Sequence, residues 1–245
     1  NPDGPELLDI YSKGARAKIR WDVSDTFSLM LTGSVNEGSN NAGLNFENTR
    51  PAGAFAAVIE ADPKRDRKVS LDQLPGAEVE SSLFSFTAEW ALPWFDTKLI
   101  LSDQELDAFF VAADFDGSAT PLVSFISKKQ VSLQETAELQ IISNENSPFS
   151  EHIEWVGGVF YLESSGGFDP LGFNVTATAL PDAVGDVLDL VGVDLDTSIT
   201  LFTGGVLVSE SLAYYLQGTW FATDTIDFTA GVRYQEEERD LEKSR

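Results

Sequence analysis

Few side chains in this sequence have the potential for catalysis. The chain contains one histidine, His152, and no cysteine. A chain without cysteine has no disulfide framework, no thiolate metal site and no cysteine nucleophile. His152 adjoins a predicted turn, where a solvated imidazole is a better interpretation than a metal ligand. No nucleophile elbow, phosphate-binding glycine loop or zinc motif is present, so we expect no catalytic residue, no cofactor and no enzyme activity.

Aspartate-rich segments are the remaining candidates for metal binding. They comprise residues 114–117 and residues 194–196. Carboxylate oxygens are suitable ligands for calcium, but neither segment has the ligand spacing of an EF-hand loop. We therefore interpret both as solvated loops and predict no metal site. The same interpretation covers the overall acidity: the chain carries 40 acidic and 16 basic residues, a formal net charge of −24, which excludes binding to DNA or RNA.

Another set of polar side chains is defined by its spacing. Within residues 15–23, cationic side chains alternate with apolar ones. Strict alternation is typical of a strand whose two faces differ. Charged side chains suit a wet or plugged interior better than a closed apolar core. We predict that they contact a plug or an anionic ligand, or alternatively pair with acidic neighbours on the same wall. Two polar residues of the last alternating pair are predicted to face the same interior. The predicted lumen-facing set comprises Arg16, Lys18, Arg20, Gln217 and Arg233.

The elements that position these side chains are predicted to be four hairpins, or about eight strands. Short polar turns join the strands of each pair, for example at Ser24-Asp25 and at Thr223-Asp224. The turns at 93–96 and 144–150 each contain proline. The predicted strand pairs are residues 15–23 with 27–35, 82–92 with 97–107, 131–141 with 153–163, and 212–221 with 226–234.

Long polar connections alternate with these short turns. They lie at roughly residues 38–80, 108–128 and 164–208 and are rich in Gly, Pro, Asn and Asp. A compact soluble domain rarely needs three such loops. Short turns at one end and long loops at the other are the standard plan of outer-membrane barrels. The fold class is therefore predicted as all-β, an antiparallel transmembrane β-barrel segment with long extracellular loops.

Aromatic residues near the predicted strand ends favour a membrane over water. Amphipathic rings prefer the level of the lipid headgroups, where they form girdles around membrane barrels. Predicted strand lengths of about 9–11 residues match a tilted crossing of the hydrocarbon layer. Ordinary packing in the core of a soluble β-sandwich remains the alternative. The predicted girdle residues are Trp21, Trp90, Trp94, Trp155, Tyr214, Trp220 and Tyr234.

The last predicted hairpin resembles one that is common in TonB-dependent receptors. Residues 212–220 (LAYYLQGTW) and 229–234 (TAGVRY) carry the resemblance, and an acidic and basic run follows them. Residues 16–32 are similar to another hairpin of that family, and residues 134–142 with 155–161 to a third. The likeness lies in the strands and short turns and is absent from the long connections.

The resemblance implies an outer-membrane importer with a barrel of about 22 strands and a plugged lumen. Its expected function is TonB-coupled import of a siderophore, haem, cobalamin or glycan-type ligand. Its expected location is the outer membrane of a Gram-negative bacterium. The implied partners are outer-membrane lipid, the plug domain and remaining strands of the receptor, a small-molecule ligand such as a metal chelate, and the TonB complex.

Several family features are not found in the sequence. Neither a plug domain nor a TonB box is recognised, so residues 1–245 are expected to be part of the barrel domain alone. The polar N-terminus has no apolar signal segment, which predicts a processed or internal piece of a longer protein. A passive porin-like barrel and a soluble β-sandwich binding module are the alternative functions.

Overall fold

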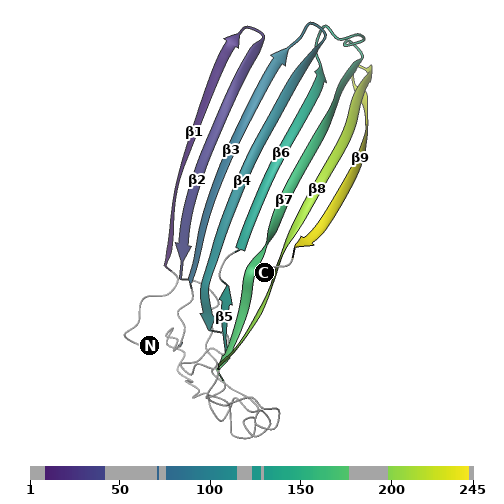
Figure 1. The fold of residues 1–245 in the computed structure, drawn as a ribbon. Coiled ribbons are helices and arrows are strands. Elements are labelled where there is room, and N and C mark those ends of the chain that lie inside the picture. The colour runs from purple at the N-terminus through teal and green to yellow at the C-terminus, as the bar shows by residue number, and fades with distance from the viewer. Residues whose placement is uncertain are drawn as a thin grey trace.

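The computed structural model describes residues 9–41, 71, 76–114, 123–127, 130–176 and 198–242. Within these ranges the chain forms one antiparallel sheet of nine strands and no helix (Figure 1). The strands are β1 (Ile10–Ser24), β2 (Phe27–Asn40), β3 (Gly76–Ala91), β4 (Phe95–Asp114), β5 (Val123–Ser127), β6 (Gln130–Ser143), β7 (Ile153–Thr176), β8 (Ser198–Thr223) and β9 (Ile226–Glu242).

Neighbours in sequence are neighbours in the sheet. The strand order is β1-β2-β3-β4-β5-β7-β8-β9, and β6 also lies between β4 and β7. Because β5 and β6 follow one another along the same two strands, the nine strands occupy eight positions. The predicted all-β antiparallel fold and its four hairpins are confirmed. Among the described residues, no helix is long and apolar enough to cross a membrane.

The short turns all lie at one end of the sheet, which we call the turn end (Figure 1). The opposite end, where the long connections leave the sheet, is the loop end. Two adjacent turns are bonded together at the turn end. Asn144 Nδ2 donates to the carbonyl oxygen of Leu92 at 2.9 Å and to Asp96 Oδ1 at 3.2 Å. The hydroxyl of Ser147, a buried residue, donates to the carbonyl oxygen of Trp94 at 2.5 Å.

Several strands are longer than the sequence indicates. β4 continues to Asp114, β7 to Thr176, and β8 begins at Ser198, so parts of the predicted loops are strand. β4 also begins at Phe95, inside a predicted turn. The extension of β7 contains Gly166 and Gly167, and glycine has weak strand propensity, but pairing with β6 and β8 overrides that preference. Residues 42–70, 72–75, 115–122, 128–129 and 177–197 lie outside the described parts.

The sheet has an apolar face and a polar face. One register row on the apolar face runs through Leu31, Phe86, Leu101, Ala137, Tyr161 and Leu212. The next row, on the polar face, runs through Thr32, Ser85, Ser102, Thr136, Leu162 and Ser211. The hydroxyls of Ser102 and Thr136 lie 2.6 Å apart. Alternation along each strand therefore separates the two kinds of side chain over the whole sheet.

Burial is reversed relative to a water-soluble protein. On the apolar face, Ile19 is 65% exposed and Val232 is 68% exposed. On the polar face, Thr32 and Ala213 are buried. Side chains crowd together on the inner side of a curved sheet and spread apart on its outer side, so the polar face is the inner one. The described residues form a single layer and not the two packed layers of a sandwich.

Candidate lumen wall and membrane-facing surface

A charged cluster lies on the polar face near the turn end. Asp22, Ser28, Glu89 and Lys98 are direct cross-strand neighbours on four successive strands. Arg20 is 2.8 Å from Asp22 and 3.9 Å from Glu89, and Lys98 is 3.0 Å from Glu89. Arg20 is thus paired with acidic neighbours on its own face of the sheet.

The other two cations of β1 have different surroundings. Arg16 and Lys18 are exposed on the same polar face, and their cross-strand neighbours on β2 are Ser34 and Thr32. These neighbours carry no charge. Among the described residues, neither cation has a hydrogen bond or an ion pair. β1 is an edge strand, so no strand of the described residues lies on its second side.

Gln217 and Arg233 lie at the opposite edge of the sheet. Gln217 is on β8 and faces Gly231 on β9. The Arg233 guanidinium lies 5.7 Å from the centre of the Phe160 ring, and its Nε donates to Gln235 Oε1 at 3.3 Å. The five predicted lumen residues therefore share the polar face, but they form two groups on the two edge regions and do not converge on one site.

A polar contact that sequence reasoning missed joins β6 to β8 across β7. The hydroxyl of Tyr215 donates to Glu138 Oε1 at 2.6 Å. The Tyr215 ring reaches Glu138 by lying over Gly158, where a Cβ atom would be 2.6 Å from the ring. The only sequence indication is a glycine between the two positions in the register. Glycine at this position allows an aromatic side chain to bridge two strands.

The aromatic residues form two bands on the apolar face. Trp21, Trp90, Trp155 and Trp220 lie toward the turn end, and Trp94 lies in the β3–β4 turn itself. Two of these rings pack on phenylalanines. The ring centres of Trp90 and Phe27 are 6.2 Å apart, and those of Trp220 and Phe228 are 5.8 Å apart. Tyr214 and Tyr234 are direct cross-strand neighbours nearer the loop end. Of the seven predicted girdle residues, five lie toward the turn end, and the two tyrosines lie farther along β8 and β9.

The aromatic bands run at an angle to the register rows. One row begins at Trp21 near the turn end of β1 and ends at Tyr234 in the middle of β9. The residues between them are Leu29, Ala88, Leu99, Leu139, Val159 and Tyr214. Cross-strand neighbours lie on a line perpendicular to the strands. When the strands tilt relative to the apolar band, as barrel strands do, that line crosses the band at an angle.

A row of carboxylates crosses the apolar face and, on β7, β8 and β9, lies on the loop-end side of the tyrosines. Asp103, Glu135, Glu163, Glu210 and Glu238 are consecutive cross-strand neighbours on β4, β6, β7, β8 and β9. We call them the carboxylate row. The hydroxyl of Tyr161 donates to Glu163 Oε2 at 3.0 Å, which links the tyrosine band to the row. Sequence reasoning missed the row, although each member occupies an apolar-face position in its strand.

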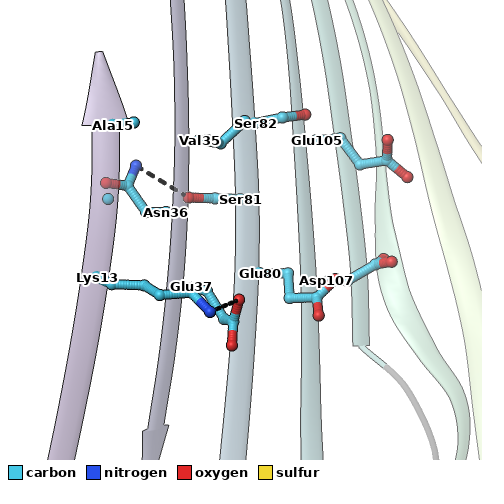
Figure 2. Close-up of a pocket in the computed structure, with 11 residues that line it drawn as sticks. Lys13, Ala15, Val35, Asn36, Glu37, Glu80, Ser81, Ser82, Glu105 and Asp107 are labelled. Atoms are coloured by element: carbon cyan, nitrogen blue, oxygen red, sulfur yellow. Dashed lines mark hydrogen bonds and ion pairs between the residues drawn. The ribbon is translucent and has the colours of Figure 1, made fainter.

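Figure 2 shows the loop end of β1 to β4, where a shallow depression of about 520 Å³ lies between the strands. Lys13, Glu37, Glu80 and Asp107 are direct cross-strand neighbours there. Lys13 Nζ is 2.8 Å from Glu37 Oε2. Lys13 lies beyond the apolar band, and the hydrogen bond to Glu37 raises the pKa of its amine above the usual value. The depression is acidic and open to solvent.

The prediction that the chain has no metal site can be compared with the structure only for the described residues. Residues 115–117 and 194–196 lie outside the described ranges. Among the described residues, no group of three or more histidine, aspartate or glutamate side chains is placed to hold a metal ion. His152 is exposed in the β6–β7 turn, and its amide donates to the carbonyl oxygen of Phe149 at 2.9 Å.

Comparison with known proteins identifies the fold. The chain superimposes on the ferric yersiniabactin uptake receptor FyuA from Yersinia pestis with a TM-score of 0.66 and 14% sequence identity. The chain has the fold of a receptor-barrel segment. The match covers 96% of this chain and 34% of the receptor, so the chain spans about a third of that protein's length. No protein-family model and no curated protein sequence matches the chain.

The sheet formed by the described residues is open, and its two edge strands are β1 and β9. At 14% identity the likeness concerns the path of the backbone and not the residues on either face.

Proposed function

We propose that residues 1–245 are part of the barrel domain of a TonB-dependent receptor in the outer membrane of a Gram-negative bacterium. The observation that carries this proposal is the uncovered apolar face, bounded by aromatic bands and ending at the carboxylate row. On β8 the apolar-face positions run from Trp220 to Leu212, and Glu210 follows. This span matches the roughly 9–11 residues with which a tilted strand crosses the hydrocarbon layer.

The polar face is the proposed lumen wall. Arg16, Lys18, Arg20, Gln217 and Arg233 are candidates for contact with a plug domain or with the transported ligand. FyuA is a ferric yersiniabactin uptake receptor, which supports a small metal chelate as the cargo. Energy coupling through the TonB complex completes the proposed activity. It follows from the family resemblance of the hairpins and requires parts of a receptor beyond residues 1–245.

The orientation of the sheet is tested by adjacent arginine substitutions on β8. Leu216 is on the apolar face, and Gln217 is on the polar face with Val156 and Gly231 beside it. We expect Leu216→Arg to lower the free energy of unfolding in lipid vesicles by about 2–4 kcal/mol, because it places a charge in hydrocarbon. Gln217→Arg should change it by less than about 1 kcal/mol, because its side chain stays in water.

The measurement is urea unfolding of each variant in vesicles, followed by tryptophan fluorescence. Equal losses in the two variants, or a wild-type chain that folds as a monomer in plain buffer, would reject a membrane barrel. A passive porin-like barrel is distinguished by the coding sequence that surrounds residues 1–245. A receptor requires an upstream plug domain, and a porin does not.

A further inference from the structure

The free edge of β1 carries an unusual charge pattern. β1 contains four cations and one carboxylate in a chain whose net charge is −24. Three of the cations, Arg16, Lys18 and Arg20, are successive side chains on the polar face. The alternate positions are Ala15, Ala17 and Ile19 on the apolar face. The cations therefore lie at the depth of the apolar band.

Of these three cations, two have no charged partner on the β2 side. Arg20 is paired with Asp22 and Glu89. Arg16 and Lys18 face Ser34 and Thr32, which offer no charge. The other polar-face cations of the described residues do have partners: Lys98 contacts Glu89, Arg239 contacts Glu237, and Arg233 contacts Gln235 and the Phe160 ring.

Within the sheet formed by the described residues, the outer side of β1 is the position from which a cross-strand partner can reach both cations. Directly opposite residues of an antiparallel pair have Cβ atoms about 4.5–5.5 Å apart, and opposite charges there stabilise the pairing. The backbone imposes the same requirement, because an unpaired strand edge in lipid leaves donors and acceptors without hydrogen bonds. A single neighbouring strand satisfies both needs.

We propose that β1 pairs with a strand, supplied by a part of the barrel outside residues 1–245, that presents carboxylates opposite Arg16 and Lys18. The alternate residues of that strand are apolar and face lipid. This inference rests on the proposed barrel function and adds the chemistry of the neighbouring strand. The match covers 34% of FyuA, so about two thirds of that receptor lies outside the part that resembles this chain.

A second copy of this chain fits the edge less well. The other free edge is β9, whose polar-face charges are Asp227, Arg233, Glu237 and Arg239. Two cations among four charges make β9 a poor complement to a run of three cations. Most of the acidity of β9 lies on its other face, at Glu236, Glu238, Asp240 and Glu242.

The experiment measures how well synthetic cysteine-containing peptides form a disulfide with a cysteine variant of the complete chain in detergent micelles. The chain has no cysteine, so Ala17→Cys places a single thiol on the apolar face between Arg16 and Lys18. The probe is a nine-residue peptide of alternating valine and glutamate with a central cysteine. When that cysteine lies opposite position 17, the adjacent glutamates lie opposite Arg16 and Lys18. Matched peptides carry serine or lysine in place of glutamate.

We expect the glutamate peptide to be trapped about fivefold more than the serine peptide, and the lysine peptide least, as two cross-strand ion pairs predict. Arg16→Gln with Lys18→Gln in the Ala17→Cys chain should abolish the preference. The control is Ala230→Cys on the β9 edge, which is on the same face but flanked by the uncharged Thr229 and Gly231. It should trap the glutamate and serine peptides equally.

Three results would overturn the proposal. They are equal trapping of all peptides at position 17, the same glutamate preference at position 230, and dominant crosslinking between Ala17→Cys and Ala230→Cys chains without peptide, which would make a second copy the neighbour. Failure of the barrel function itself has a different signature. It appears in the vesicle experiment with Leu216→Arg and Gln217→Arg, which does not depend on charges at the β1 edge.

Discussion

At the scale of single residues, Gly158 and Tyr215 show how a glycine shapes the polar face. A Cβ atom at position 158 would lie 2.6 Å from the Tyr215 ring and 2.6 Å from the carbonyl oxygen of Leu139. We expect Gly158→Ala to displace the ring, break the bond from Tyr215 to Glu138, and lower the free energy of unfolding by about 1–3 kcal/mol through overpacking. Urea titration in vesicles measures this loss.

The matched control is Gly33→Ala. Gly33 is on β2, and a Cβ atom there would meet no atom within 4 Å. Its unfolding free energy should be unchanged or slightly higher, because alanine has less freedom than glycine in the unfolded chain. Equal losses for the two alanine variants would show that the Tyr215 ring does not depend on the glycine beneath it.

At the scale of elements, the turns act as a connected set. Asn144 bonds the β6–β7 turn to Leu92 and Asp96 of the neighbouring hairpin, and its Oδ1 accepts from the amide of Asn146 at 3.0 Å. Asn144→Ala removes these bonds and should lower the unfolding free energy by about 1–3 kcal/mol. Asn146→Ala, whose side chain makes no described bond, should have little effect in the same titration.

Like charges in the carboxylate row repel one another across neighbouring strands. Glu163 lies directly between Glu135 and Glu210, and like charges in that relation destabilise a sheet. We expect Glu163→Gln to raise the unfolding free energy by about 0.2–1 kcal/mol at low salt and by less at high salt. Glu89→Gln should change it in the opposite direction, because Glu89 lies near Lys98 and Arg20. Unfolding at two ionic strengths compares the variants, and a stability loss in Glu163→Gln contradicts the account.

The elements were more predictable than the contacts between them. Alternation of period two located all four hairpins and the two faces, because burial on one side of a strand is encoded locally. The loop-end extension of β7 was missed, because Gly166 and Gly167 there are held in strand by pairing with β6 and β8. The carboxylate row and the Tyr215–Glu138 bond depend on the register between strands, which a single sequence does not provide.

At the scale of the whole molecule, the apolar face must be covered for the sheet to be stable. Several large rings, including Trp21, Trp90 and Trp220, are more than half exposed on that face. In vesicles, lipids brominated along the acyl chain should quench most of the tryptophan fluorescence, whereas a water-soluble quencher such as acrylamide should have little effect. The reverse result would place the rings in water.

The slanted row from Trp21 to Tyr234 limits how a gene for this sheet can change in length. One codon gained between a turn and the carboxylate row would rotate every later side chain of that strand to the opposite face. Two codons would preserve the faces but shift the tyrosines relative to those of the next strand. Tolerated insertions and deletions are therefore expected beyond the carboxylates, where the strands have already left the slanted belt.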